Sequence, residues 1–257
     1  MDRKYIRITK AEINLIKNLR NKNVRHEERT FVAEGSRLVL DIIKSKPSDL
    51  RLIVATEDWI TGQGANLSHF SDLVREISPS QLQSVASLKS TEEVLSLVQF
   101  PSFTTEDKPP KQFALYLDGL TDPGNVGTLI RTADWFGLDE IMLSPNSVDV
   151  FNSKTVQASM SSICRVKTTI IPPDEIKCYS GISKLVGADI NGKNLWPVSQ
   201  NWEPVVICLG NEAHGLSEPL RALCDEFWSI PSYSLGAESL NVAISGAIMM
   251  AHWKSKM

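Results

Sequence analysis

The sequence predicts an α/β fold: a C-terminal domain built around a mostly parallel sheet, preceded by a smaller α/β domain. In the second half, short apolar runs alternate with helical segments, as strands joined by crossover helices do. Between the halves, residues 101–112 (PSFTTEDKPPKQ) hold three prolines and no apolar period, which is typical of a linker. We therefore expect an N-terminal domain at residues 1–100 and a C-terminal domain at residues 113–257.

The first hundred residues predict short helices and strands in alternation. Residues 10–23 repeat apolar positions at helical spacing beneath a basic outer face, so they predict an amphipathic helix. The segment 31–33 predicts a short strand, 36–43 a helix and 50–56 a second strand. The alternation continues to Val98, which makes this domain a small layered α/β fold.

After the linker the alternation is clearer. The expected strands cover residues 113–117, 140–143, 164–170, 205–210 and 227–230. The expected helices cover residues 126–136, 153–161, 217–223 and 239 to the end of the sequence. Gly137 ends the first of these helices, as a glycine cap does. Because parallel strands end at one edge of a sheet, we expect the ligand site in the loops that follow them.

Charge is unevenly distributed along the chain. The net charge is −3, yet residues 1–30 hold nine Lys and Arg against four Asp and Glu, and the remainder holds 18 against 26. A basic N-terminal segment on an acidic body fits local contact with phosphate. A solvated amphipathic helix would show the same charge, so this feature alone does not decide between the two.

Composition also limits the classes of function. The cysteines and histidines are scattered, with no C-x-x-C pair, so we expect buried thiols and no metal site. The longest apolar stretch, 240–253, contains Asn, Ser, Gly and His and is too short to span a bilayer. No targeting signal is apparent at the start. We therefore expect a cytoplasmic protein without a membrane partner.

Three strand-end loops carry unusual residues, and the first covers residues 118–131. Asn125 follows a Pro-Gly turn and is expected to cap the next helix. Gly127 allows close approach of a backbone or a ligand. Arg131 lies inside the helix among apolar neighbours, so we expect it to have a partner. That partner is either an internal carboxylate or a phosphate.

The second loop covers residues 209–217, between an apolar strand and a helix that Ser217 could cap. Gly210 leaves main-chain groups accessible, and Asn211 and Glu212 place polar groups at the strand end. An ordinary α/β turn has the same pattern.

The third loop, residues 230–241, leads into an apolar helix. Ser239 and Asn241 stand at the start of this helix, and either could be only a capping residue. Gly246 and Ala247 are small and would let the helix pack closely against another backbone.

Two cofactor-binding motifs are missing, which limits the classes of enzyme further. The sequence has neither a G-x-G-x-x-G that opens a helix after a strand nor a G-x-x-x-x-G-K-[ST]. A dinucleotide dehydrogenase, a P-loop enzyme and the open-sheet class of methyltransferase are therefore unsupported.

Taken in order, the three loops resemble the signature motifs of the SpoU/TrmH family of SPOUT methyltransferases. The matching text is PGNVGTLIRTADWFG, LGNEAHGLS and IP…ESLNVAISGAI, spread over much of the C-terminal half. The segment HEERTFVAEGSRLVLDII resembles the substrate-binding module of many members, a small α/β domain related to ribosomal RNA-binding proteins. The resemblance covers nearly the whole chain.

The resemblance implies a C-terminal domain with a deep trefoil knot, a rare exception to unknotted topology. It implies that S-adenosylmethionine lies bent in that knot, held largely by main-chain groups. The residues expected around it are Leu209, Gly210, Asn211, Ile230 and Leu240. The resemblance also implies a homodimer with the active site at the subunit interface.

For catalysis, the resemblance implies Asn125 and Arg131 from the first motif, Glu212 from the second, and Ser239 and Asn241 from the third. A guanidinium stays protonated in proteins. We therefore expect Arg131 to hold an RNA phosphate, while the phosphate or Glu212 receives the hydroxyl proton.

The function implied is S-adenosylmethionine-dependent methylation of a ribose 2′-hydroxyl in structured RNA. The N-terminal module favours ribosomal over transfer RNA. A knotted RNA-binding or ribosome assembly factor without catalysis, and an enzyme that methylates a base atom, remain as alternatives.

Overall fold

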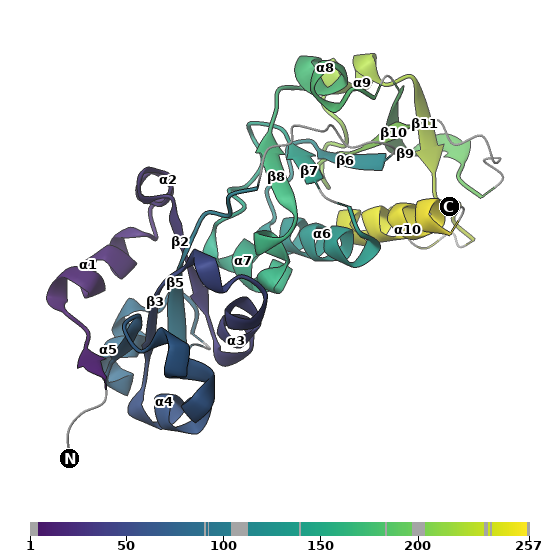
Figure 1. Cartoon of the computed structure of the whole chain (residues 1–257). Coiled ribbons are helices and arrows are strands. Elements are labelled where there is room, and N and C mark those ends of the chain that lie inside the picture. Colours follow the sequence, from purple (N-terminus) through teal and green to yellow (C-terminus); the bar gives the residue numbers. More distant parts are fainter. Residues whose placement is uncertain are drawn as a thin grey trace. The chain divides into compact units, whose positions relative to one another are not determined.

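The computed structural model describes residues 5–89, 91, 93–103, 113–138, 140–182, 184–196, 204–233, 236 and 238–255. The chain divides into two units (Figure 1). Unit 1 comprises residues 1–102 and 151–164, and unit 2 comprises residues 103–150 and 165–257. Most of the expected linker, 104–112, lies outside the described residues.

Unit 2 is built on a six-stranded sheet in the order β11-β9-β10-β6-β7-β8. Every pairing between its described strands is parallel, which confirms the predicted parallel sheet. Its strands are β6 (Phe113–Leu117), β7 (Glu140–Leu143), β8 (Lys167–Ile170), β9 (Lys184–Asn194), β10 (Val205–Leu209) and β11 (Glu226–Ser229). The sequence did not predict β9, because its second half is largely exposed and carries no apolar run.

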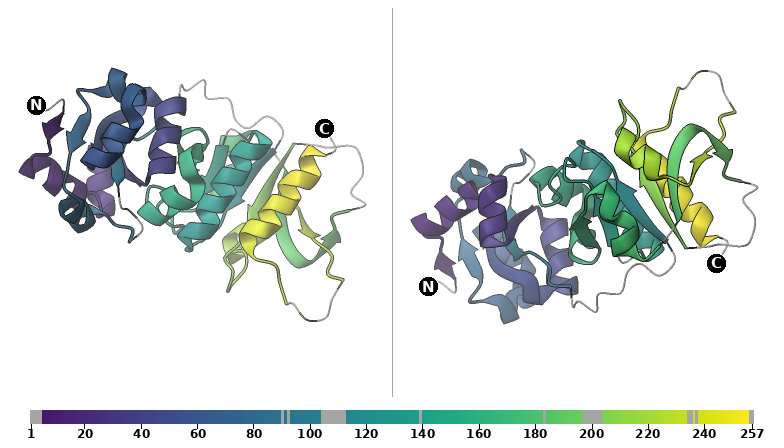
Figure 2. Two further views of the ribbon diagram at one scale, coloured as in Figure 1. Left: turned by 90° about the horizontal axis from the view of Figure 1, so that it is seen from below. Right: turned by 90° about the horizontal axis from the view of Figure 1, so that it is seen from above.

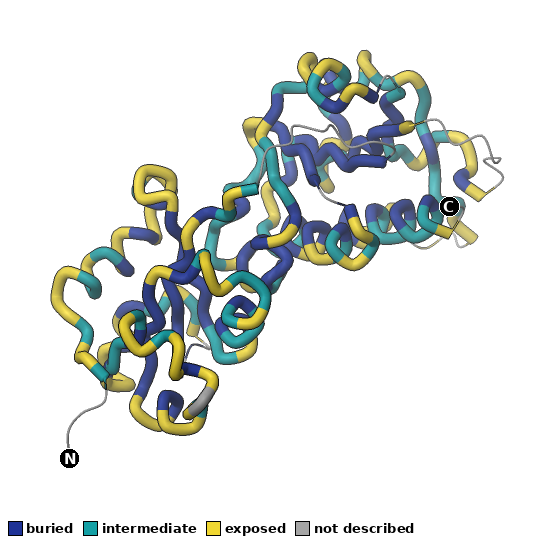
Figure 3. The backbone as a smooth tube through the Cα atoms, in the orientation of Figure 1, coloured by how far each residue is buried: buried dark blue, intermediate teal, exposed yellow. Residues whose placement is uncertain are grey.

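Helices cover both faces of this sheet (Figure 1). They are α6 (Pro123–Phe136), α8 (Ile176–Ser180), α9 (Glu218–Leu223) and α10 (Val242–Lys254). Strand side chains alternate between the faces. Tyr116 and Cys208 pack in one core cluster with Ile176 of α8 and Leu220 of α9. Leu209 faces α10 instead. Buried residues therefore lie on both sides of the central strands, whose tube is largely dark blue in Figure 3.

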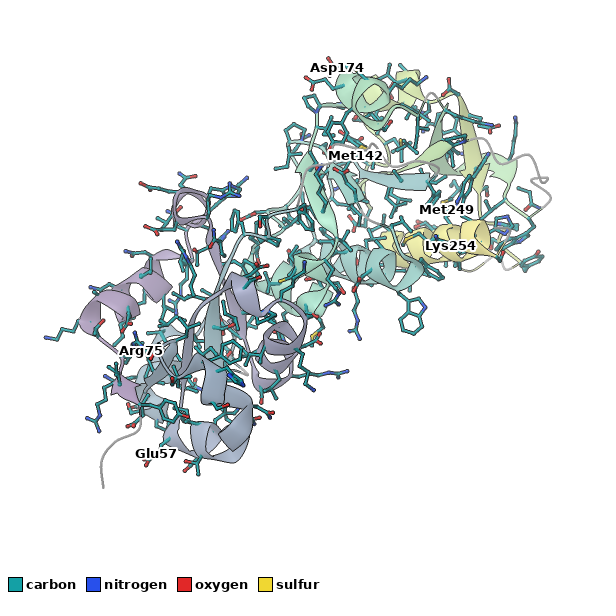
Figure 4. The ribbon with its side chains drawn as sticks, viewed as in Figure 1. Glu57, Arg75, Met142, Asp174, Met249 and Lys254 are labelled. Atoms are coloured by element: carbon teal, nitrogen blue, oxygen red, sulfur yellow. The ribbon has the colours of Figure 1, made fainter. Side chains whose placement is uncertain are left out.

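Helices α6 and α10 lie side by side (Figure 2). Their contact requires Gly246, since a Cβ there would lie 2.4 Å from Leu129 Cδ2 and 2.9 Å from Leu209 Cδ1. The predicted close approach at Gly246 is thus real, but the neighbours are side chains rather than a backbone. Met249, labelled in Figure 4, is also buried on α10.

The start of α6 corrects one prediction. The helix begins at Pro123, because Asp122 Oδ1 accepts the N–H of Asn125 at 2.8 Å. Asp122 is therefore the N-cap, and Asn125 lies in the first turn with its side chain released from capping. The helix ends as predicted, at Gly137 with φ of 67°.

Unit 1 contains a mixed sheet in the order β1-β4-β3-β5-β2. Its strands are β1 (Ile6–Arg7), β2 (Thr30–Glu34), β3 (Leu50–Ala55), β4 (Val74–Glu76) and β5 (Val94–Gln99). Strands β1, β4 and β3 are parallel, whereas β5 runs antiparallel to β3 and β2. The helices are α1 (Lys10–Asn18), α2 (Lys22–Glu28), α3 (Ser36–Ser45), α4 (Glu57–Gln63) and α5 (Pro79–Val85). An ion pair between Arg75 (Figure 4) and Glu12 joins β4 to α1 at 2.9 Å.

The predicted single helix at residues 10–23 is two helices. The first ends at its cap, Leu19, and Asn21 begins the second by accepting the N–H of Asn23 at 2.9 Å. Asparagine competes with helical hydrogen bonds in this way, which explains the break.

A segment from the second half of the sequence packs in unit 1. It contains α7 (Ser153–Ser159) and a 3₁₀ turn (Met160–Cys164). Phe151 stacks on Phe31 and Phe100, with ring centroids 5.3 and 3.8 Å apart. Ser161 donates a hydrogen bond to Asp41 of α3. Residues 151–164 thus complete the core of unit 1, although they lie in the stretch expected to form the C-terminal domain.

Candidate active site

Two of the three motif loops leave neighbouring strands at the same level. Leu117, the last residue of β6, is in register with Leu209, the last residue of β10. From β6 the chain goes to β7 on one side, whereas from β10 it goes to β11 on the other side. The gap between β6 and β10 is therefore the switch point at which open parallel sheets bind ligands.

Asp118 joins these two loops. Its N–H donates to Leu209 O at 2.8 Å, and its Oδ2 accepts the N–H of Ser217 at 2.7 Å. Asn211 Nδ2 adds a bond to Gly119 O at 2.9 Å. Asp118 is almost fully buried, so its carboxylate fixes the loops rather than meeting a ligand. Sequence reasoning did not select Asp118, although its place directly after an apolar strand was a usable signal.

The second loop closes tightly on itself. A Cβ on Gly210 would lie 2.2 Å from the carbonyl carbon of Gly215, so glycine is required at position 210. Asn211 and Gly215 exchange two main-chain hydrogen bonds of 2.9 and 2.8 Å. The N–H of Asn211 is thus used within the loop. Among the described hydrogen bonds, the main chain of Gly210 is not used.

Three side chains, one from each motif, form a continuous hydrogen-bonded row. Asn241 Nδ2 donates to Asn125 Oδ1 at 3.0 Å, and Asn125 Nδ2 donates to Glu212 Oε1 at 2.5 Å. Asn241 Oδ1 caps α10 by accepting the N–H groups of Ala243 and Ile244. Asn241 is therefore both a cap and a part of the site.

The direction of this row follows from the helix cap. Because Asn241 Oδ1 faces N–H donors, its amide nitrogen points the other way and donates to Asn125. Asn125 then accepts with its oxygen and must present its own amide nitrogen to Glu212. Each amide orientation is set by its neighbour, and the row ends on a carboxylate that faces solvent.

Arg131 is not part of this row within one chain. It is exposed on α6, and no partner for it is seen among the described residues. Of the two partners that the sequence left open, an internal carboxylate is not seen among the described residues, because the helix turns Arg131 outward. Trp135, one turn further, is 84% exposed, and Ile244 of α10 is 50% exposed. Arg131 thus lies one helical turn from a large aromatic side chain that the described residues leave exposed.

The remaining expected residues surround the row less directly. Ser239 is exposed and precedes the cap of α10 by two residues. Leu209 is buried, Leu240 is 47% exposed, and Ile230 directly follows β11. No contact between Ser239 and the row is seen in the described residues.

Three further observations concern metal ligands, cysteines and membrane-spanning helices. No group of three His, Cys, Asp or Glu side chains in the described residues could hold a metal ion. None of the four cysteines forms a disulfide, and Cys178 is exposed rather than buried as expected. None of the helices in the described residues combines the length and the hydrophobicity that a membrane span needs.

Comparison with known proteins gives matches along the chain. Residues 112–251 match the model of the SpoU rRNA Methylase family, and residues 10–96 match an MRM3-like substrate binding domain. The chain is 30% identical over 245 residues to the 23S rRNA (guanosine(2553)-2′-O)-methyltransferase RlmP of Bacillus subtilis, covering 92% of this chain and 93% of that protein.

Solved structures of related proteins resemble the chain over nearly its whole length. A TrmH-family protein from Porphyromonas gingivalis has a TM-score of 0.81 and 31% identity, covering 97% of this chain and 99% of that one. An AdoMet-bound rRNA methyltransferase from Sinorhizobium meliloti has a TM-score of 0.80 and 25% identity, covering 97% and 96%. With its three motifs joined at one sheet edge, the chain belongs to the SpoU rRNA Methylase family.

Proposed function

We propose that this protein methylates a ribose 2′-hydroxyl in ribosomal RNA, with S-adenosylmethionine as the methyl donor. The observation that carries the proposal is the row Asn241–Asn125–Glu212, which joins all three family motifs at the switch point. The similarity to RlmP over 92% of the chain supports both the reaction and ribosomal RNA as the substrate.

The sheet edge fits the methyl donor. The main-chain groups of Gly210, which are not used within the described residues, stand beside the row at the end of β10. We place the donor between Gly210, Ile230 and Leu240, with Leu209 behind it and Asn211 shaping the loop. S-adenosylmethionine supplies a methyl group on a sulfonium, which is already a good leaving group. The residues of the site therefore act mainly by positioning.

Glu212 receives the proton of the ribose hydroxyl in this proposal. Asn125 holds Oε1 of Glu212, so the carboxylate keeps one orientation while its Oε2 accepts. As the ribose oxygen gains the methyl group, its O–H bond breaks and the proton passes to Glu212. Ser239, next to Leu240, orients the ribose.

Arg131 contributes from the other subunit of a homodimer. Its guanidinium binds the phosphate beside the target ribose, since it has two N–H edges and stays charged. The exposed face formed by Trp135 and Ile244 supports a dimer through α6 and α10. An isologous dimer would bring each Arg131 to the partner's site.

Three further features complete the proposal by analogy with the family. The end of the chain is threaded as a trefoil knot, residues 1–100 select the RNA while 113–257 carry the reaction, and the protein works in the cytoplasm. The match of residues 10–96 to a substrate binding domain supports this division of labour.

Transfer of tritium from labelled S-adenosylmethionine to a 23S rRNA transcript tests the proposal. Digestion to nucleosides and mass analysis should give one 2′-O-methylnucleoside, and alkali should leave one resistant linkage. A base-methylated nucleoside, or transfer only to transfer RNA, would overturn the assignment. No transfer to any RNA would leave the RNA-binding factor as the better reading.

A further inference from the structure

Unit 1 contains a cavity that the methyl transfer does not use. Its volume is about 330 Å³, within the size range of ligand pockets. The residues that line it come from the turn after α1, from α2, β2 and the turn after α5, and from the entry into α7: Leu19, Arg20, Arg25, Val32, Ala86, Ser87, Phe151, Asn152 and Ser153. We propose that this cavity binds one unpaired nucleotide of the RNA substrate, an inference that rests on the proposed function.

The charge of the lining favours an anion. Two arginines line the cavity and no carboxylate does. Arg20 Nη2 donates to the carbonyl oxygens of Val85 and Ala86 at 3.0 and 2.8 Å. These acceptors are neutral, so they orient the guanidinium without cancelling its charge. In the described residues, Nε and Nη1 of Arg20 form no hydrogen bond with the protein.

Arg25 is held in a similar way from within the fold. It is only 7% exposed, and its Nη1 donates to the carbonyl oxygens of Leu19 and Arg20, both at 2.8 Å. A side chain fixed before binding loses little conformational entropy when a phosphate arrives. The cavity is thus organised in advance for a phosphate group.

The turn after α5, which also lines the cavity, is fixed as well. The turn after α5 is anchored by the buried carboxylate of Glu34, which accepts the N–H groups of Ser87 and Leu88 at 2.9 and 3.1 Å. Those bonds use main-chain donors, so the hydroxyl of Ser87 is left for the cavity. It can bond to a sugar or a base edge.

An aromatic wall supplies the apolar part. Phe151 lines the cavity and is held by stacking on Phe100 and Phe31. Phe100 in turn lies 5.9 Å from the guanidinium of Arg29. Cations, hydroxyl and amide groups, and an aromatic surface together match a phosphate joined to a sugar and a base. Single-stranded RNA is recognised through such unstacked nucleotides.

Two substitutions of the full-length protein test the site at two lining residues from different segments of the chain. Ser87→Glu and Ser153→Glu each place a carboxylate in the lining, and Glu is favourable in the first turn of α7. The readout is filter binding of a labelled 23S rRNA transcript across salt concentrations. Each variant should raise Kd about tenfold and lower the slope of log Kd against log salt by about 1.

Ser80→Glu is the matched control, since Ser80 is exposed on α5 and does not line the cavity. It makes the same change in net charge and should alter Kd less than about twofold. Equal losses in Ser80→Glu, or wild-type binding by both lining variants, would overturn the proposal. A second result would also overturn it: the wild type binds AMP or inorganic phosphate, and Ser87→Glu loses that binding but still binds the RNA transcript as tightly as the wild type.

The experiments distinguish a failure of the proposed function from a failure of the cavity assignment. If the wild-type protein transfers no methyl group to any RNA, that function fails. If it methylates 23S rRNA and the lining variants methylate equally well at limiting RNA, only the cavity assignment fails. Retention of S-adenosylmethionine binding by the variants, measured by calorimetry, shows that unit 2 is intact.

Discussion

Asn241 donates a hydrogen bond to Asn125 across 116 positions of sequence, at 3.0 Å. The bond links the first turn of α6 to the cap of α10, so the helix cap determines how the motif-one amide is turned. Hydrogen bonds in such a row strengthen one another. The carboxylate of Glu212 is consequently oriented by a helix terminus that never touches it.

Asn125→Ala should lower kcat by about 100-fold, because Glu212 loses the donor that fixes its carboxylate. The Kd for S-adenosylmethionine should stay within about threefold of the wild type, since Gly210 and its neighbours are unchanged. Single-turnover tritium transfer and calorimetry give the two values. Asn191→Ala, an exposed position on β9, is the control. An unchanged kcat in Asn125→Ala would show that the row does not matter for catalysis.

Arg131→Ala and Asn125→Ala should each keep no more than about 1% of wild-type activity alone and regain activity when refolded together. If Arg131 serves the partner's site, a mixed dimer has one complete site, so an equal mixture recovers about a quarter of wild-type activity. The measurement is tritium transfer after mixing under denaturant and dilution. If Arg131 acts within its own chain, every mixed dimer lacks a complete site. The mixture would then stay inactive, and the assignment to the partner would be wrong.

Gly246→Ala should lower the free energy of unfolding by about 1–3 kcal/mol, because its Cβ would press on Leu129 between α6 and α10. Urea denaturation measures the change. Gly62→Ala is the matched control: Gly62 lies in α4 with open space around the added Cβ, so it should stabilise by up to about 1 kcal/mol. Adding Leu129→Ala to Gly246→Ala should cost less than the sum of the two changes. Strict additivity would argue against direct contact.

Asp225→Asn should destabilise the protein at neutral pH but not in acid. Burial raises the pKa of Asp225, yet the N–H of Leu185 and the ammonium of Lys177 outweigh this, so its pKa lies below the ordinary value. A carboxyl group with a lowered folded-state pKa adds stability above its unfolded pKa of about 3.9, and this is lost as the pH falls through the folded value. The difference in urea midpoint between variant and wild type should therefore be constant from about pH 8 to 5 and shrink below about pH 4.

Asp174→Asn, at the exposed turn before α8 (Figure 4), is the comparison for that series. It removes one charge without touching the Leu185 main chain. If both variants lowered the urea midpoint equally, the change in net charge, and not the contacts of Asp225, would be the cause of the lost stability.

Much of the fold could be predicted from the sequence because local signals agreed with the global arrangement. Apolar runs of five residues gave β6 and β10, and a run of three gave most of β7, since strands buried on both faces are largely apolar. Strand β9 was missed for the opposite reason. Its second half is exposed and pairs with β11 at the sheet edge through a register shift. The spacing of apolar residues in the sequence does not indicate such a pairing.

The sequence predicted which residues belong to the site but not the hydrogen bonds between them. Asn125, Glu212 and Asn241 were selected from three motifs, yet only the structure shows that they bond to one another. The cap at Asp122 was missed because two residues three apart, Asp122 and Asn125, are equally good caps by type. The outward side of Arg131 could not be read from neighbours in sequence, because adjacent residues on a helix point in different directions.

The placement of residues 151–164 has a consequence for how such enzymes can be recombined. This strip lies within the stretch that matches the methylase family, but it packs in unit 1 around Phe151. The two units are therefore not consecutive segments of the chain. A chimera that exchanges only residues 1–102 would set a foreign core against Phe151. A graft that folds must therefore carry residues 1–102 and 151–164 together.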